Sequence, residues 1–364
     1  MAQKIWAAMS GGVDSSVMAH RLIEAGYDVE GVTMSLYRPP VAEGTLPLPC
    51  GSDEDIRDAR AVCDKLGIPH RVYDFGQVFT DTVIRDFVSV YEAGGTPNPC
   101  IVCNKHLKFG ALLDAALSEG ADGIATGHYA RVEKDTGSGR YLLKTAADES
   151  KDQTYVLWQL TQDVLSRVRL PLGGLRKSDI RAMAEALGLI TAHKSDSQDI
   201  CFVPDGDYAA FIERHTGHPS LPGNYVAEDG QVLGHHKGII HYTVGQRKGL
   251  GIALGQPMFV KSKDARTGDV VLTTNDRLFS RRIHLDNVNW IAVGRLDAPL
   301  RVTAKIRYQH KASPATLVPT GEGTATLCFD EPQRAAAQGQ SAVCYDGDTV
   351  IGGGLIVGVE DGLA

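Results

Sequence analysis

The pattern of hydrophobic and polar positions predicts two different kinds of structure along the chain. Over about the first 212 residues, short apolar runs alternate with segments of amphipathic helical period. This alternation is typical of an α/β fold, in which helices cover a parallel sheet. We expect strands at residues 4–9, 29–36, 70–75 and 123–126, helices at 17–25, 52–66, 80–91, 107–117, 155–168 and 178–187, and a hairpin at 132–144.

From about residue 213 the pattern changes to β-branched runs separated by glycines. Residues 217–255 are rich in Gly and His, which predicts a small middle domain with many loops. After residue 281 short strands predominate, and they predict a compact barrel or sandwich. The strands expected there are 302–308, 325–329, 341–345 and 349–356. The predicted domains are therefore 1–212, 213–280 and 281–364.

Composition narrows the functional classes. The chain has 364 residues, 43% of them hydrophobic and 22% charged, which excludes a disordered or fibrous protein. The formal charge is −7, so a nucleic-acid partner would have to be held by a local basic surface. We find no signal peptide and no apolar run of about 18 residues, and expect a cytoplasmic protein without membrane contact. Seven cysteines, an odd number spread along the chain, indicate reduced thiols.

The strongest motif is Ser10-Gly11-Gly12-Val13-Asp14-Ser15-Ser16, between a predicted strand and a predicted helix. Backbone N–H groups and the helix dipole favour an anion at such a junction, and glycines let the chain approach phosphate closely. Asp14 is placed to position Mg²⁺. A simple Gly-Gly turn with a helix cap is the alternative, but seven suitable residues in this context favour phosphate. The loop resembles that of the ATP pyrophosphatases (PP-loop proteins), which cleave ATP to AMP and pyrophosphate.

Two cysteine segments form the second signal. Cys100 and Cys103 follow a proline-stiffened approach. We expect Cys103 to lie just ahead of a helix, where the dipole and the nearby Lys105, His106 and Lys108 favour a thiolate. Cys201 follows a polar turn and is expected to be accessible. Half of a structural zinc site is the alternative for the first pair, although no second Cys-x-x-Cys exists. We interpret the other cysteines as structural: Cys50, Cys63, Cys328 and Cys344.

Several segments in a fixed order make the chain similar to the tRNA-specific 2-thiouridylases (the MnmA family). They are residues 9–16, 98–105, 125–129, 151–153 and 200–202, and residues 245–251, 307–308 and 339–343 extend the match to the C-terminal region. The resemblance implies a doubly wound catalytic domain, a small central domain and a C-terminal β-barrel. It also implies that ATP adenylates O2 of the wobble uridine of tRNA, and that sulfur then replaces this oxygen.

The resemblance also implies roles for individual residues. Cys201 would carry a persulfide supplied by a cysteine-desulfurase relay, and Cys103 would then attack it, leaving a Cys103–Cys201 disulfide for a reductant. ATP would be held by Ala8, Met9, Ser10, Gly11, Gly12, Val13, Asp14 and Ser15, with Met34 and Gly127 beside the nucleoside. Asn98, Pro99 and Cys100 would lie against the target base. The residues expected to contact tRNA are His128, Lys151, Asp152, Gln153, Arg307, Tyr308 and Gln340.

Cys100 departs from the family pattern, in which an acidic residue occupies this position. The change weakens a carboxylate-base role and adds a third thiol. Three thiolates at Cys100, Cys103 and Cys201 would suit a 4Fe-4S cluster with one open iron that delivers sulfur without a protein persulfide. Both routes remain open from the sequence.

Residues 261–311 carry eleven basic and five acidic side chains, a local charge of +6. Solvated strand edges would explain this surplus, but the resemblance favours an RNA-facing surface. The basic loop 246–251 could follow an RNA backbone. We interpret His235, His236 and His241 as surface or satisfied histidines rather than metal ligands.

Two other functions remain open. Another ATP pyrophosphatase, such as an amidotransferase or a ligase, would use the phosphate loop but would not need Cys103 and Cys201. A non-catalytic tRNA-binding or metal-storage protein would need neither turnover nor Asp14.

Overall fold

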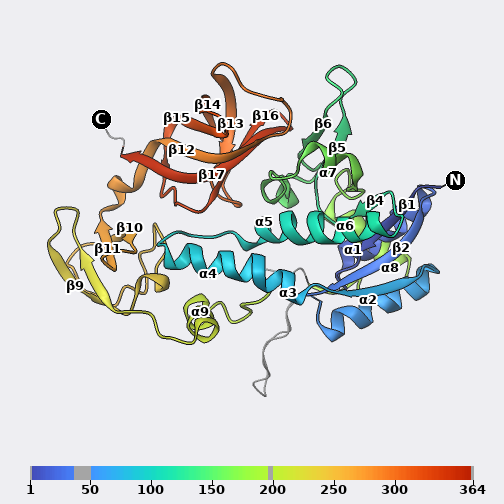
Figure 1. Cartoon of the computed structure of the whole chain (residues 1–364), viewed down its shortest axis with the longest axis horizontal. Helices are drawn as coiled ribbons and strands as arrows, with labels where there is room; N and C mark the ends of the chain where they lie inside the picture. The colour runs from blue at the N-terminus through green and yellow to red at the C-terminus, as the bar shows by residue number, and fades with distance from the viewer. Residues whose placement is uncertain (1, 37–50, 196–199, 362–364) are drawn as a thin grey trace.

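The computed structural model describes residues 2–36, 51–195 and 200–361, and it has three parts (Figure 1). The first is a five-stranded parallel sheet in the order β3-β2-β1-β4-β7. The α/β class predicted from the apolar pattern is therefore confirmed. The strands are β1 (Lys4–Ala8), β2 (Asp28–Ser35), β3 (His70–Asp74), β4 (Gly123–Ala125) and β7 (Val168–Arg169).

Helices cover both faces of this sheet because its strands are apolar on both sides. Along β1, Ile5 and Ala7 lie in one core while Trp6 lies in the other, as strand alternation requires. The first core packs α1 (Val13–Glu24), α2 (Asp53–Leu66) and α8 (Lys177–Ala186), and the second packs α6 (Leu112–Ser118). The helix expected at 52–66 is confirmed as α2, and the Ser52 hydroxyl caps it by accepting a hydrogen bond from Asp55 N at 3.1 Å.

Two helical rods cross the middle of the molecule (Figure 1). The first comprises α3 (Gly76–Phe79), the π-helix η1 (Thr80–Ile84) and α4 (Arg85–Glu92). The second comprises α5 (Pro99–Cys103), the π-helix η2 (Asn104–Ala111) and α6. The predicted helix 107–117 therefore begins eight residues early, because Pro99 occupies the first helical position, where its fixed φ favours a start.

The prediction of a single helix at 155–168 was wrong. This stretch contains the short turn η4 (Thr154–Val156) and, separately, α7 (Gln162–Arg167). Thr161 ends the continuity because its side chain caps α7 by accepting a hydrogen bond from Val164 N at 3.4 Å. Tyr155 and Trp158, which look like one helical face, are both fully buried in the core.

The central part is a four-stranded sheet in the order β10-β11-β8-β9. Its strands are β8 (Gly223–Val226), β9 (Val232–His236), β10 (Phe259–Asp264) and β11 (Asp269–Thr273). Tyr225, Val260 and Val270 form its small core. Helix α9 (Tyr208–Thr216) precedes the sheet but packs into the α/β core through Phe211, so the central part is anchored to the first.

The C-terminal part is a closed six-stranded barrel. Of the two architectures predicted from the sequence, a barrel or a sandwich, the barrel is therefore correct. The order is β12-β15-β14-β13-β16-β17, and β17 pairs back with β12. The strands are β12 (Phe279–Trp290), β13 (Leu300–Lys305), β14 (Ser313–Gly321), β15 (Thr324–Arg334), β16 (Ser341–Asp346) and β17 (Thr349–Asp361).

The predicted hairpin at 132–144 is confirmed, and it joins the α/β part to the barrel. It consists of β5 (Arg131–Lys134) and β6 (Tyr141–Lys144), and Lys144 pairs with Thr349 of β17. The Arg140 guanidinium donates hydrogen bonds to the carbonyls of Ile291, at 2.9 Å, and Trp290, at 3.2 Å. These contacts fix the barrel against the α/β part. Among the described helices, none is both long enough and apolar enough to cross a membrane.

Candidate active site

The loop at residues 10–16 connects β1 to α1 and is shaped by its own side chains. The Ser15 hydroxyl accepts a hydrogen bond from Ser10 N, at 3.2 Å, and donates one to the carbonyl of Gly12, at 3.0 Å. Gly11 has a φ of 71°, and a Cβ there would lie 2.6 Å from the carbonyl oxygen of Asp55. Gly12 makes no side-chain cap for α1, so the first N–H groups of the helix are left for an anion.

Asp14 is held by two residues that the sequence analysis did not connect with it. Lys177 Nζ lies 2.8 Å from both carboxylate oxygens, and the Tyr129 hydroxyl donates a hydrogen bond to Oδ1 at 2.6 Å. The Lys177 side chain is only 11% exposed. A lysine at the first turn of α8 is thus brought to the phosphate loop by tertiary folding. No local spacing could reveal this contact, because 163 residues separate the pair.

Gly127 closes the loop from the adjacent strand. A Cβ at this position would lie 3.1 Å from the backbone carbon of Asp14 and 3.2 Å from Ser15 N, so glycine lets the turn after β4 approach the start of α1 more closely than most side chains would. The neighbouring His128 is 7% exposed and bonds to Thr126 Oγ1 at 2.8 Å. Burial holds the pKa of His128 well below its usual range. Its neutral, interior ring is poorly placed to touch tRNA.

Cys103 and Cys201 pack against the same group of buried side chains, although 98 residues separate them in the sequence. We call this group the Phe202 cluster; Phe202 packs there against Phe79, Phe87 and Phe211 at ring-centroid distances of 5.2–5.5 Å. Both cysteines are half-buried at its edge, and Met34 of β2 packs against it as well. The two cysteines and Met34 therefore all pack against one core.

The helical setting of the cysteines differs from the prediction. Cys103 lies at the fifth position of the rod that starts at Pro99, rather than ahead of a helix. The positive end of the helix dipole therefore acts on the exposed Cys100, in the first turn, more than on Cys103. Immediately after Cys103 the rod widens into the π-helix η2, an irregularity frequent at functional sites.

The described thiols do not assemble a metal cage. In residues 2–36, 51–195 and 200–361, no group of three His, Cys, Asp or Glu side chains is placed to hold a metal ion. Cys100, Cys103 and Cys201 are all described and do not form such a group, so the described residues give no support to the three-thiolate alternative. The same finding applies to the zinc alternative for Cys100 and Cys103. Residues 196–199, for which the sequence predicts a polar turn, and Cys50 lie outside the described residues.

One surface gathers several of the residues expected to meet RNA. Tyr308 is 40% exposed, and its pKa is raised by burial and by the nearby Asp152 and Cys100, while a hydrogen bond with Gln153 opposes the shift. The Tyr308 ring lies 6.0 Å from that of Tyr155. The barrel thus brings Tyr308 beside the helix start that carries Cys100.

Other residues expected to bind tRNA are turned inward. Asp152 is 8% exposed, and its carboxylate accepts hydrogen bonds from Ala146 N, at 3.2 Å, and from the Thr154 hydroxyl, at 2.7 Å. Arg307 donates to the carbonyl of Ala335. Gln340 donates to backbone carbonyls of the turn before Asn98. Their observed contacts shape the protein itself. Lys151 is half-buried in η3 (Glu149–Lys151).

The basic segment 261–311 is largely neutralised by carboxylates. For example, Lys261 lies 2.6 Å from Glu228, and Arg301 lies 2.7 Å from Asp330. Further ion pairs involve Arg266, Arg277, Arg282, Arg295 and Lys305. By contrast, Arg247 and Lys248 are exposed on the glycine-rich turn 245–251. The turn is therefore a stronger electrostatic candidate for RNA than the segment as a whole.

The histidines of the central part have polar partners. His235 bonds to Asn224 at 3.0 Å, His236 accepts from Gly238 N at 3.0 Å, and His241 lies 3.7 Å from Glu213.

Each of the three parts of the protein matches a known family model. A family model described as a tRNA methyl transferase HUP domain matches residues 3–205, a tRNA methyl transferase PRC-barrel domain matches 209–274, and an aminomethyltransferase beta-barrel domain matches 280–356. A solved complex of a 4-thiouridine synthetase with RNA and bound ATP covers 56% of this chain and 45% of its own, at 20% identity and a TM-score of 0.37, which is too distant to carry an argument.

Curated relatives match nearly the whole chain. The tRNA-specific 2-thiouridylase MnmA of Clostridioides difficile is 48% identical over 98% of this chain and 98% of its own length. That of Acetivibrio thermocellus is 48% identical over 97% of this chain and 99% of its own length. Together with the parallel sheet, the phosphate loop and the two cysteines at one core, these matches show that the chain belongs to the tRNA-specific 2-thiouridylase family.

Proposed function

We propose that this protein uses ATP to replace O2 of the wobble uridine of tRNA with sulfur, releasing AMP and pyrophosphate. The observation that carries the proposal is that Cys103 and Cys201 both pack against the Phe202 cluster, in a protein whose first strand leads into the loop at residues 10–16. A pyrimidine carbonyl oxygen is a poor leaving group until it is phosphorylated. A protein that removes it needs both an adenylating site and a sulfur nucleophile.

In the first step the uracil O2 attacks the α-phosphate of ATP, and pyrophosphate leaves. Residues 8–15 hold the phosphates, and Met34 and Gly127 border the nucleoside. Lys177 stabilises charge at the phosphate end, since its ammonium already lies 2.8 Å from Asp14. Fixed positive charge near the oxygens of a transferring phosphoryl group is a large source of rate acceleration.

The loop also fits Mg²⁺ brought in with ATP. Mg²⁺ in nucleotide sites is bound by one or two carboxylates together with phosphate oxygens and water, and Asp14 offers such a carboxylate at 31% exposure. When bound, the ion would neutralise phosphate oxygens and ease the departure of pyrophosphate. Lys177 and Tyr129 orient the carboxylate of Asp14.

In the second step the terminal sulfur of a Cys201 persulfide attacks C2 of the activated base, and AMP leaves with the oxygen. The Cys103 thiolate then attacks the Cys201 sulfur, so that the S–S bond to the base breaks, 2-thiouridine is released and a Cys103–Cys201 disulfide forms. A dithiol reductant reopens that disulfide, and a cysteine-desulfurase relay reloads Cys201. We prefer this route to the 4Fe-4S route because three thiols are not gathered in the described structure.

The target base would lie against Asn98, Pro99 and Cys100, where α5 begins. Cys100 is exposed there, and Tyr308 is close enough to it to offer a stacking face. Exposed Arg247 and Lys248 would contact the tRNA backbone. Because ATP and tRNA are both cytoplasmic, the same proposal places the reaction in the cytoplasm.

The experiment is mass spectrometry of unmodified tRNA after incubation with the protein, ATP, Mg²⁺ and a persulfide donor. We expect the exchange of one oxygen for one sulfur at the wobble uridine. Cys328→Ser is the matched control, because this half-buried cysteine lies on the barrel strand β15. Full activity of both Cys103→Ser and Cys201→Ser would favour the amidotransferase or ligase class. Full activity that depends on bound iron and sulfide would reject the persulfide route.

A further inference from the structure

The turn between α4 and α5, residues 94–97, is held by side chains from both other parts of the protein. We call it the junction turn. It leads directly into Asn98 and the rod that carries Cys103. In Figure 1 the turn lies at the end of α4 that faces β10 and β11.

Three consecutive carbonyls of the junction turn receive hydrogen bonds from outside the α/β part. Lys263 of β10 donates to the carbonyl of Gly95 at 3.0 Å. Gln340, just before β16 of the barrel, donates to the carbonyls of Thr96, at 3.0 Å, and Pro97, at 3.2 Å. Buried carbonyls normally find partners within their own element or in water. Here two different domains supply them.

The backbones fit each other as closely as the side chains do. Thr96 N donates to the carbonyl of Gln338 at 2.8 Å. Gly339 has a φ of 84°, and a Cβ there would lie 3.1 Å from the Thr96 carbonyl oxygen. Gly94 has a φ of 82°, and a Cβ there would lie 2.9 Å from the carbonyl oxygen of Lys263. Glycines on both sides thus allow three segments of the chain to approach one another closely.

The ammonium group of Lys263 lies among backbone carbonyls and an aromatic ring rather than in solvent. The ammonium also donates to the carbonyl of Tyr242 at 2.8 Å and lies 5.3 Å from the centre of the Tyr91 ring. Burial lowers the pKa of Lys263 to about 8. The position just beyond the C-terminus of α4 suits a cation because the helix dipole is negative there.

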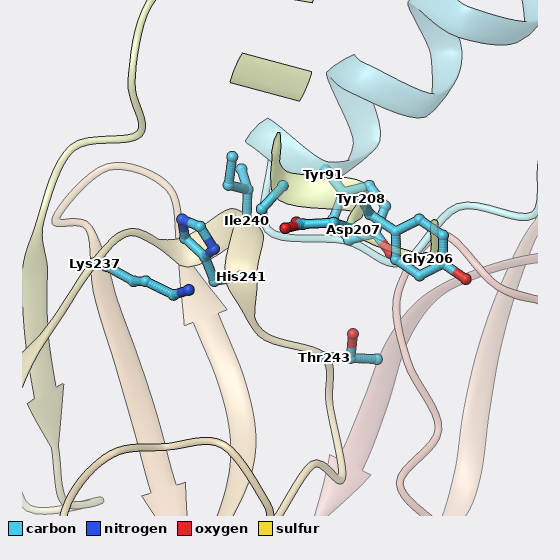
Figure 2. Close-up of a pocket in the computed structure, with 9 residues that line it drawn as sticks. Tyr91, Gly206, Asp207, Tyr208, Lys237, Ile240, His241 and Thr243 are labelled. Carbon is cyan, nitrogen blue, oxygen red and sulfur yellow. The ribbon is translucent and has the colours of Figure 1, made fainter. Parts of the chain in front are cut away.

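Both apolar packing and hydrogen bonds join α4 to the central part. A cavity of about 190 Å³ lies between Tyr91 of α4, the start of α9 and residues 237–243 of the central part (Figure 2). None of the residues that line it was predicted to belong to the site. Ile240 of the central part packs in the same core as Tyr91, and the hydrogen bond from Lys263 to the carbonyl of Gly95 adds a directional contact between the two parts.

We propose that Lys263 and Gln340 are positioning residues for Cys103. They lock the junction turn between the central sheet and the barrel, and the prolines at 97 and 99 pass this position on to the rod. Docking of tRNA on the two outer domains and the placement of the Cys103 sulfur are thereby coupled. This inference rests on the proposed function, and it gives Gln340 a role within the protein in place of a contact with tRNA.

The test compares two variants with a matched control. Lys263→Met and Gln340→Met keep side-chain length but remove the hydrogen bonds. Lys65→Met is the control, because Lys65 also donates to a distant glycine carbonyl, that of Gly188, at 2.5 Å, but does so from the last turn of α2. Lys263→Arg should restore the donors. Thermal unfolding first establishes that each variant is folded.

Single-turnover kinetics then separate the two chemical steps. We expect tRNA-dependent pyrophosphate release to stay within about threefold of wild type, while sulfur incorporation falls about tenfold or more in both variants, since small displacements of a reacting atom are costly. Lys263→Arg should recover most of the loss, and Lys65→Met should lose nothing. Equal losses in both steps, or an equal loss in Lys65→Met, would overturn the inference.

A second readout does not depend on the proposed function. The rate at which iodoacetamide alkylates Cys103, followed by peptide mass spectrometry, reports how the rod is placed. We expect this rate to change at least about threefold in Lys263→Met and Gln340→Met and to stay unchanged in Lys65→Met. If wild type does not thiolate tRNA but these rates differ, the proposed function fails and the positioning role stands. Identical rates in all proteins would reject the positioning role.

Discussion

The phosphate loop and the cysteine site are built in opposite ways. The loop is continuous: Ser10, Gly12 and Ser15 bond to one another within six residues, and the α1 helix begins inside it. The cysteines lie 98 positions apart and pack against one cluster, and the junction turn that leads into the rod accepts hydrogen bonds from two other domains. A local motif can bind a nucleotide in many proteins. The cysteine site, which is assembled from distant segments, would limit the substrate of this protein to a particular nucleic acid.

The largest expected effect comes from the assembled site. Replacing either Cys103 or Cys201 with Ser should lower sulfur incorporation by about a thousandfold or more, because the nucleophiles act as a unit. Pyrophosphate release should continue, since the loop is untouched. Parallel assays of tRNA thiolation and pyrophosphate release check this. Loss of both activities together would mean that the two regions are not separable.

Lys177→Met should have the next largest effect, and on the opposite step. Removing the ammonium leaves Asp14 without its ion pair and takes positive charge away from the phosphates. We expect adenylation to fall about a hundredfold, in the range of losses seen when a single charge-stabilising donor is removed. Pyrophosphate release at saturating ATP measures it. The control Lys4→Met removes a 35%-exposed lysine near Glu30 and should change the rate little.

A pair of glycines tests how strictly the loop is shaped. Gly11→Ala forces a Cβ to 2.6 Å from the Asp55 carbonyl at a φ of 71°, whereas a Cβ at Gly12 meets only the Ser10 hydroxyl at 3.6 Å. Gly11→Ala should raise the KM for ATP about tenfold and lower the free energy of unfolding by about 1–3 kcal/mol. Gly12→Ala should do far less to both. Equal effects would show that the loop adapts.

The smallest effect concerns His128. Its folded pKa is depressed by burial, so the unfolded chain binds a proton at a higher pH than the folded chain does. The stability tied to the neutral ring is therefore present above about pH 6.5 and is lost as the pH falls further. Denaturant unfolding between pH 7 and 5 should show a weaker pH dependence in His128→Gln than in wild type. The affinity for tRNA should change less than about threefold. A large loss of affinity would instead support the prediction that His128 contacts tRNA.

Local signals in the sequence predicted local structure well. The helix expected at 52–66 lies between Ser52, which caps α2, and Gly67, which ends it in the left-handed conformation at a φ of 70°. The start of the Cys103 rod was missed because Pro99 was interpreted only as a stiffener of the approach. Lys177 was missed because its partner is 163 residues away. Gln340 was predicted to contact tRNA. The residues next to it in the sequence do not reveal that its amide donates to two carbonyls of another domain.

The most direct test of the central claim is peptide mass spectrometry of the protein after one turnover without reductant. The protein would be loaded with persulfide sulfur and mixed with ATP, Mg²⁺ and unmodified tRNA. We predict one Cys103–Cys201 disulfide for each 2-thiouridine formed, with Cys328 still reduced. Thiolated tRNA accompanied by reduced Cys103 and Cys201 would contradict the account.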